Sequence, residues 1–320
     1  MKTLVVWLGA FWFAISNHLA HLHPEKIFFS YEKDEAIIRS VSTTRMHPYF
    51  FPGIKLPENV HCIDDILSIL KEVNIIIIII PIPFVAGFID SIAWYIQPGA
   101  IFVNCSKGID NKDLFTVSDI LSSKLAHIPY SYATLSGGMI ASELVSGAPL
   151  GTSIGISDMK DESTLRTLFE SDRLSVSITP EYKNIELFGA IKNVFALYVG
   201  YMEGKWFGMS TIGLVVTSLY KELPRLLFLL GWTERIDFSD FALWGDLIAT
   251  CFGNSRNRYF GRLVWEGKTS IEAFEQLKSE KKHAEGYETL RGISDLIKEN
   301  NFVEFQKVVD EYKSYVAKIP

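Results

Sequence analysis

The chain of 320 residues has few cysteines and no excess of positive charge. The three cysteines are Cys62, Cys105 and Cys251. They lie far apart in the sequence, include no CxxC pair and are odd in number, so they do not form a disulfide framework, which favours a reducing compartment. Lys and Arg number 31 against 37 Asp and Glu, so no basic excess indicates nucleic acid as a partner. Repeats and low-complexity linkers are also absent. An anionic ligand would have to be held by a local pocket.

Long uninterrupted apolar runs are missing as well. Residues 75–89 are apolar, but Pro81 and Pro83 interrupt them, and a membrane span needs roughly 20 apolar residues. We expect a buried parallel strand there, and no membrane span. Residues 4–20 (LVVWLGAFWFAISNHLA) allow two interpretations, the apolar region of a signal peptide or a first strand followed by a helix. The single charge before the run and the poor cleavage site at 15–20 disfavour the signal peptide.

What the chain has is enough apolar material, 48% of its residues, for two domains with cores of their own. As far as residue 180, strand patterns alternate with helical patterns, which is typical of a mostly parallel sheet covered on both faces. The predicted strands are 3–8, 26–31, 74–80, 99–106, 131–137, 152–157 and 174–179, and the predicted helices are 10–20, 63–72, 84–96 and 163–171.

After residue 181 the pattern becomes helical throughout. The segments with helical periodicity are 184–204, 211–231, 238–251, 270–281, 287–300 and 301–316. Thr269 and Glu272 have the spacing of a capping box at the start of one of them. We therefore predict an α/β domain over 1–180 and an all-helical domain over 181–320.

Lys192 lies among apolar residues at helical spacing, namely Phe188, Gly189, Phe195 and Ala196. An ammonium group on such a face needs a partner, because burial otherwise lowers its pKa. A lysine with a lowered pKa suits a general acid near neutral pH. The alternative is a side chain that reaches past the apolar face to solvent.

Two further charged residues stand in apolar surroundings. Asp246 lies in WGDLIATC, where its carboxylate would either be buried and seek a cation or cap a helix, and Thr250 shares its helix face and could hydrogen-bond a ligand. Lys107 follows the strand predicted over 99–106, and ligands of doubly wound sheets lie at the carboxyl ends of strands. Lys107 is then either a ligand-binding lysine or a solvated loop residue.

Arg256 and Asn257 stand together in NSRNRYF, at the start of a helical pattern. The guanidinium group of an arginine beside the N–H groups of a helix start suits a dianion such as a phosphate. The alternative is that these residues are solvent-exposed loop residues that bind no ligand. We predict Arg258 to be a surface residue.

His18, His21 and His23 are the closest approach to a metal-binding pattern. Their spacing matches none of the usual zinc sets, and neither cysteine nor carboxylate joins them nearby. We interpret them as a helix end and a loop and expect no metal site.

Six blocks in order along the chain resemble one family. They are HPYFFPGIKLPENV (47–60), CSKGID (105–110), LSGGMIASEL (135–144), ELFGAIKNV (186–194), WGDLIATCFGNSRNRYFG (244–261) and HAEGYETL (283–290). In sequence, order and spacing they resemble the NAD-dependent glycerol-3-phosphate dehydrogenases. The resemblance places residues 4–20 in the dinucleotide-binding loop rather than in a signal peptide.

The resemblance implies a Rossmann-like doubly wound sheet followed by an all-α domain like the C-terminal helical domain of 6-phosphogluconate dehydrogenase. It implies an oxidoreductase that interconverts sn-glycerol 3-phosphate and dihydroxyacetone phosphate with NAD or NADP for glycerophospholipid synthesis, in the cytoplasm and as a homodimer. Two alternatives stay open: a related two-domain dehydrogenase acting on another 2-oxo or 2-hydroxy substrate, and a catalytically impaired relative with a degraded nucleotide loop.

The resemblance also implies roles for individual residues. The catalytic residues would be Lys192, Asp246 and Lys107. Substrate would be bound by Lys107, Gly137, Lys192, Asn193, Thr250, Arg256 and Asn257. The cofactor would be bound by Gly9, Ala10, Phe11, Trp12, Lys107, Ala141, Arg256 and Glu285. The choice between NAD and NADP stays open, since the end of the second strand offers only Tyr31 and Glu32 for the ribose hydroxyls.

Tryptophan replaces glycine at several positions of the family pattern. Of the three loop glycines only Gly9 is present, and the first and third are replaced by tryptophan, a costly change where a tight turn or close packing is needed. The positions concerned are Trp7, Trp12, Trp206, Trp232 and Trp265. Either the nucleotide site has drifted, or these tryptophans are glycines encoded by UGA, a codon that some bacterial lineages read as glycine.

Overall fold

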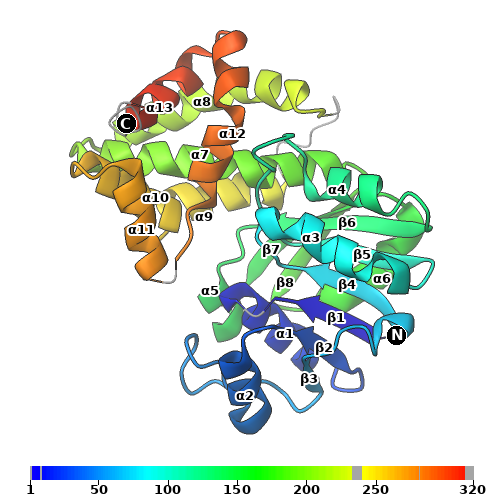
Figure 1. Ribbon diagram of the computed structural model, residues 1–320. Coiled ribbons are helices and arrows are strands. Elements are labelled where there is room, and N and C mark those ends of the chain that lie inside the picture. The colour runs from blue at the N-terminus through cyan, green and yellow to red at the C-terminus, as the bar shows by residue number, and fades with distance from the viewer. Residues whose placement is uncertain (1, 8, 233–239, 281, 314–320) are drawn as a thin grey trace. The chain divides into compact units, whose positions relative to one another are not determined.

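The computed structural model describes residues 2–7, 9–232, 240–280 and 282–313, and it divides into two compact units (Figure 1). The first unit comprises Met1–Ser106 and Val117–Ile185. The second comprises Lys107–Thr116 and Glu186–Pro320. No sequence pattern indicated that Lys107–Thr116 groups with the helices, and the physical reason is Ile109, which is buried in their core.

An eight-stranded sheet in the order β3-β2-β1-β4-β5-β6-β7-β8 forms the centre of the first unit. All neighbouring strands are parallel except β6 and β7, which are antiparallel. This is the doubly wound order, in which the chain reverses direction across the sheet between β1 and β4. The strands are β1 Lys2–Val6, β2 Phe28–Tyr31, β3 Val60–Ile63, β4 Val73–Ile78, β5 Ala100–Asn104, β6 Tyr130–Gly137, β7 Leu150–Ile156 and β8 Leu174–Thr179.

Helices cover both faces of the sheet, because its central strands are apolar on both sides (Figure 1). One apolar core joins one face to α1, α2, α5 and α6, and a second core joins the other face to α3 and α4. The predicted α/β class is confirmed. The helices are α1 Ala10–Leu22, α2 Glu35–Thr44, α3 Ile82–Ile92, α4 Val117–Lys124, α5 Ala141–Ser146 and α6 Glu162–Phe169.

One element predicted for this unit is wrong. The segment 63–72, predicted as a helix, ends a strand and then forms only the 3-10 turn Leu70–Glu72. Asp65 accepts a hydrogen bond from the backbone N–H of Leu67 at 3.0 Å, the kind of local bond by which Asp side chains compete with a helix. Strand β3 and the short helices α2, α4 and α5 were not predicted, and neither was the antiparallel direction of the predicted strand β7.

The second unit is helical and packs around one core. The middle of α7 is buried on every side and, apart from Lys192 and Asn193, apolar, as expected of a helix surrounded by others. Among the described residues it is also the one helix long and apolar enough for a membrane span, yet 94% of that stretch is buried within the protein. The helices are α7 Tyr182–Gly204, α8 Met209–Leu229, the π-helical turn η4 Phe241–Gly245, α9 Asp246–Phe252, α10 Arg256–Trp265, α11 Ser270–Ser279, α12 Glu285–Glu299 and α13 Val303–Lys313.

The helix boundaries of the second unit follow the sequence in most places. The capping box at the start of α11 is confirmed, with Thr269 and Glu272 each bonding the backbone N–H of the other. Helix α10 begins at Arg256, where the sequence predicted a helix start. The parts of the predicted helices that fall on 238–239, 281 and 314–316 lie outside the described residues.

Candidate active site

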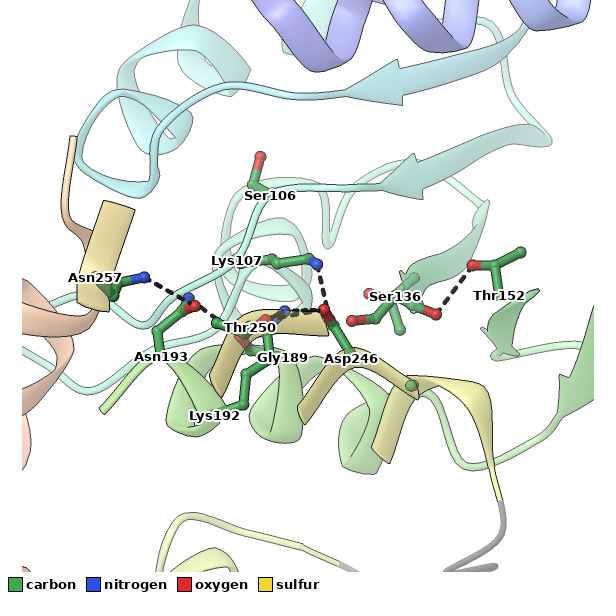
Figure 2. A network of polar contacts seen from close by, with 12 residues as sticks. Ser106, Lys107, Ser136, Thr152, Gly189, Lys192, Asn193, Asp246, Thr250 and Asn257 are labelled. Atoms are coloured by element: carbon green, nitrogen blue, oxygen red, sulfur yellow. Dashed lines mark hydrogen bonds and ion pairs between the residues drawn. The ribbon is translucent and has the colours of Figure 1, made fainter. Parts of the chain in front are cut away.

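Two lysines of the second unit share one buried carboxylate (Figure 2). Lys192 Nζ forms an ion pair with Asp246 Oδ1, and Lys107 Nζ lies 2.8 Å from Asp246 Oδ2. Lys192 Nζ also donates to Thr250 Oγ1 at 2.9 Å, and that hydroxyl donates to Asp246 Oδ1 at 3.3 Å. The side chains of Lys192 and Asp246 are 3% and 4% exposed, while that of Lys107 is 25% exposed. Lys107 is therefore the most exposed of these three charged side chains.

Three separate segments bring these side chains together. Lys192 comes from the middle of α7, Asp246 is the first residue of α9, and Thr250 follows one turn later on the same face. The π-helical turn η4 leads directly into α9, and such turns are frequent at functional sites. Lys107 begins the segment that follows β5. The sequence indicated each of these residues, but not that one carboxylate serves both lysines.

The charges of the cluster do not cancel, since two ammonium groups face one carboxylate. Burial, assisted by the positive charge of Lys107, lowers the pKa of Lys192 to about 7, against the attraction of Asp246. Burial also acts to lower the pKa of Lys107, but the charge and hydrogen bond of Asp246 outweigh it and raise that pKa. Burial acts to raise the pKa of Asp246, and the two lysines reverse this and lower it. Near neutral pH Lys192 is thus poised between its charged and neutral forms.

A second polar chain lies beside the first (Figure 2). Asn257 Nδ2 donates to Asn193 Oδ1 at 3.0 Å, and Asn257 Oδ1 accepts from the backbone N–H of Gly286 at 3.0 Å. Gly286 must be a glycine, because a Cβ there would lie 2.4 Å from the carbonyl oxygen of Asn193. The chain thus ties α7, α10 and the first turn of α12 together, and the sequence reasoning missed Gly286. Burial acts to lower the pKa of Lys107, whereas Asp246, then Lys192 and last the negative charge of Glu285 act to raise it.

Of the three arginines of α10, Arg256 and Arg258 differ in their surroundings. Arg256 is the first residue of the helix and is exposed, and Ser255 caps the helix by accepting from the N–H of Asn257. Arg258, predicted as a surface residue, instead forms an ion pair with Glu203 and is 18% exposed. Helical geometry explains the correction, since Arg258 lies on the side of α10 that packs on α7, where Gly200 approaches it closely. Arg256 therefore stays at the surface, where a ligand can reach it.

The cofactor candidates Gly9, Ala10, Phe11 and Trp12 begin helix α1, directly after β1. Gly9 is the N-cap residue, its Cβ position is open, and none of the described side chains caps the helix. An uncapped helix N-terminus at the end of a central parallel strand fits a pyrophosphate. Trp12 is buried and donates from its indole nitrogen to Ser30 Oγ at 3.1 Å.

Two further candidates of the first unit follow β6. Gly137 ends that strand, and a Cβ there would lie 2.6 Å from the carbonyl oxygen of Gly151, so only glycine fits. Ala141 is the first residue of α5. Both lie at the carboxyl end of a sheet strand, where ligands of doubly wound folds bind.

The three N-terminal histidines bond the protein backbone. His18 Nε2 lies 3.3 Å from the carbonyl oxygen of Phe169, and His21 and His23 approach other carbonyl oxygens at 2.8 and 3.1 Å. Within the described residues, no group of three or more His, Cys, Asp or Glu side chains has the arrangement of a metal site.

Comparison with known proteins gives a consistent result. Models of the N-terminal and C-terminal parts of NAD-dependent glycerol-3-phosphate dehydrogenase match residues 3–162 and 181–313. A glycerol-3-phosphate dehydrogenase [NAD(P)+] of Leptospira biflexa is 29% identical over 92% of this chain and 88% of its own length. The cytoplasmic NAD(+) enzyme of Mus musculus is 26% identical over 90% of this chain and 84% of its own length.

Solved structures agree on the fold. The glycerol-3-phosphate dehydrogenase of Coxiella burnetii has a TM-score of 0.86 at 22% identity and covers 97% of this chain and 94% of its own. That of Saccharomyces cerevisiae has a TM-score of 0.80 at 24% identity and covers 100% of this chain and 97% of its own. Together with the two family matches, a doubly wound sheet and a helical unit are typical of the nucleotide-dependent dehydrogenases of the two-domain class. Within that class, the chain belongs to the NAD-dependent glycerol-3-phosphate dehydrogenase family.

Proposed function

We propose that the cluster around Asp246 is the catalytic centre of a glycerol-3-phosphate dehydrogenase. The reaction interconverts sn-glycerol 3-phosphate and dihydroxyacetone phosphate with NAD(P), as the two family matches and the named relatives support. The observation that carries the assignment of residues is the pair of buried lysines on one carboxylate, with the pKa of Lys192 lowered to about 7. When bound, the nicotinamide supplies or accepts the hydride at C2 of the substrate.

Lys192 is the proton donor and acceptor of the proposed mechanism. In the reducing direction its ammonium gives a proton to the carbonyl oxygen at C2, and in the oxidising direction its neutral amine takes the proton from the hydroxyl. A group with a pKa near the working pH serves both directions. Thr250, which accepts a hydrogen bond from Lys192 Nζ, restricts the direction in which the amine points.

Asp246 and Lys107 set the electrostatics of that proton transfer. The carboxylate of Asp246 orients both amines and opposes the effect of burial on Lys192. Lys107, whose pKa is raised, stays charged and stabilises negative charge that develops on the substrate oxygen. One lysine therefore titrates during the reaction, and the other holds a permanent charge.

The phosphate of the substrate is proposed to bind at the start of α10. The exposed guanidinium of Arg256 provides the charge, and Asn257 provides an amide held in place by Asn193 and Gly286. The N–H groups of the first helical turn add a favourable dipole. Arg258 is excluded from this role by its ion pair with Glu203.

For the cofactor, we propose Gly9, Ala10 and Phe11 at the start of α1 as the pyrophosphate contacts, and a preference for NAD over NADP. Glu32 directly follows β2, is buried, and accepts from the backbone N–H groups of Lys33 and Asp34 at 2.6 and 3.0 Å. An acidic residue at this place binds the ribose 2′-hydroxyl and repels a 2′-phosphate. The negative charge of Glu32 also contributes, after burial, to raising the pKa of Cys62 to about 12.

We further propose a cytoplasmic homodimer that supplies glycerol 3-phosphate for glycerophospholipid synthesis. The three cysteines are free, which suits a reducing compartment. Met209, Leu214 and Phe228 expose apolar side chains on α8, which supports a contact with a second copy. Light scattering on the purified protein tests the dimer, and a monomer at micromolar concentration would contradict it.

An assay of NADH oxidation with dihydroxyacetone phosphate tests the function. We expect turnover with this substrate and little with unphosphorylated dihydroxyacetone, because the latter lacks the group that Arg256 binds. Arg256→Ala should raise KM for dihydroxyacetone phosphate about 100-fold, and Arg262→Ala, a change at a neighbouring arginine of the same helix, should leave KM within about twofold. Equal rates with both substrates would point instead to another 2-oxo substrate.

A further inference from the structure

Trp7 has a backbone conformation that belongs to glycine. It follows β1 directly and has φ +82°, close to the +83° of Gly53 and of Gly99. The left-handed region of ordinary residues centres near +57°, and every L side chain pays a steric cost there. The turn itself is held by the sheet, since the N–H of Trp7 donates to the carbonyl oxygen of Tyr31 at 3.1 Å.

The Trp7 side chain lies where the fold would otherwise be open to a ligand. Its ring stacks on that of Phe84 with 5.8 Å between centroids, and Phe84 lies in the first turn of α3, directly after β4. The stack therefore spans the carboxyl ends of β1 and β4, between which the strand order reverses. This is the place where doubly wound sheets bind nucleotides. The open start of α1 at Gly9 suits a dinucleotide, and the indole of Trp7 does not.

Trp206, in the other unit, repeats the pattern. It follows α7 with φ +60°, at the place after a helix end that glycine most often occupies. Its side chain is 93% exposed, so packing does not compensate for the strained backbone. The loss of nucleotide binding during evolution would account for Trp7 but not for Trp206. A single explanation for both tryptophans has to apply to both units.

Tryptophan is also more frequent among the residues with positive φ than in the chain as a whole. Tryptophan makes up 7 of the 320 residues. Yet it supplies two of the six non-glycine residues with positive φ in the described part of the chain. The remaining four are Arg45, Phe51, Leu114 and Asn301. Trp94 shows the ordinary case, since it is 82% exposed on a 3-10 turn and has no positive φ.

We propose that positions 7 and 206 are occupied by glycine in the protein as its own cell makes it, from UGA codons that this cell reads as glycine. Glycine at 7 relieves the turn and clears the carboxyl ends of β1 and β4 for the dinucleotide. Glycine at 206 supplies the usual helix end after α7. The chain with tryptophan at 7 then binds NADH weakly, a part of the inference that rests on the proposed function.

The codons and the native protein decide the first part. We expect UGA at 7 and 206 and UGG at 94, and native peptides with the mass of glycine at the first two positions. UGG at either position 7 or position 206, or a native peptide with the mass of tryptophan there, would overturn the proposal. Neither measurement depends on any activity.

Stability decides the structural part, with Trp94 as the matched control. Trp7→Gly and Trp206→Gly should each keep or raise Tm, by roughly 2 °C where the strain is fully relieved. Trp94→Gly should lower Tm, because a glycine in a helical turn costs backbone entropy and gives up the contact of Trp94 with His127. A fall in Tm for Trp206→Gly as large as that for Trp94→Gly would contradict the proposal.

Calorimetric titration with NADH separates this inference from the proposed function. Trp7→Gly should lower the Kd for NADH at least tenfold, and Trp206→Gly should leave it unchanged. Tighter binding without turnover of dihydroxyacetone phosphate would leave the inference standing and refute the proposed function. Equal or weaker binding by Trp7→Gly, with turnover intact, would do the reverse.

Discussion

The two units of this protein differ in how well their side chains suit the family's chemistry. In the helical unit, every polar side chain of the cluster around Asp246 has a partner, and the glycine at 286 is the residue that its neighbours require. In the sheet unit, strand β1 and the start of α1 at Gly9 are in place, but Trp7 after the strand is strained. A fold thus preserves a loop's path even where the side chain is wrong, because the path is set by strand pairing and helix packing.

The difference also shows where precision is needed. Proton transfer depends on side-chain atoms placed within hydrogen-bond distance, so the helical unit has to supply particular residues. Pyrophosphate binding depends on backbone N–H groups, so the sheet unit has to supply a conformation and an empty space. Four changes sharpen this comparison, in order of decreasing effect.

The largest effect is expected from Lys192→Met, which removes the proton donor and leaves a side chain of similar length in the core. The rate constant kcat should fall by about 10³-fold, near the upper part of the range for general acid–base catalysis. Stability should not fall, because a buried ammonium is replaced by an apolar group. Steady-state kinetics with NADH titration checks this, and Lys221→Met, on the exposed side of α8, is the control. Retention of more than a tenth of the activity would refute the role of Lys192.

Asp246→Asn should lower kcat by about 100-fold and change its dependence on pH. In the wild type, oxidation of glycerol 3-phosphate needs neutral Lys192, so its rate should rise as pH increases through about 7, and the reverse reaction should slow over the same range. Removal of the carboxylate takes away the attraction that opposes burial, so the pKa of Lys192 should fall further and the inflection move below that of the wild type. A pH–rate profile in both directions checks the shift, and an inflection that stays in place would contradict it.

Gly286→Ala should destabilise the helical unit and weaken substrate binding together. The added methyl group meets the carbonyl oxygen of Asn193, and overpacking of this kind costs about 1–3 kcal/mol. Because Gly286 holds Asn257, KM for dihydroxyacetone phosphate should rise more than kcat falls. Gly213→Ala, on α8 where an added Cβ meets nothing, should instead stabilise the protein by about 0.5–1 kcal/mol. Thermal unfolding and kinetics of both variants check the contrast.

The smallest effect is expected from Thr269→Ala, which removes one half of the capping box of α11. The free energy of unfolding should fall by about 1 kcal/mol, with kcat and KM unchanged. Denaturant unfolding measures the loss. A change in kcat would show that α11 influences the cluster around Asp246, and no change in stability would show that the cap contributes nothing.

The sequence predicted most of the features that local chemistry determines. Periodicity located α7 and most of the strands, and the apolar neighbours of Lys192 predicted its burial. Asp246 was recognised because a carboxylate in an apolar segment needs a cation, and the structure provides Lys192 and Lys107. These features depend on residues within a few positions of one another.

The features that the sequence could not predict depend on distant contacts. The close approach of Gly286 to Asn193, the ion pair of Arg258 with Glu203 and the sharing of Asp246 by two lysines all join segments far apart in the chain. The antiparallel direction of β7 is likewise decided by pairing with β6 and not by its own residues. The positive φ of Trp7 and Trp206 became visible only once the backbone path was known.

The segment Lys107–Thr116 has a consequence for anyone who divides this protein. The chain leaves the sheet unit after Ser106, returns at Val117 and leaves again after Ile185, so three backbone connections join the units. A fragment that starts at residue 181 would lose Ile109 from its interior and would leave Asp246 with one cation in place of two. The acid–base pair and the helices around it therefore depend on the segment Lys107–Thr116, which lies in the sequence between two parts of the sheet unit. A fragment made to carry the helical unit has to include this segment.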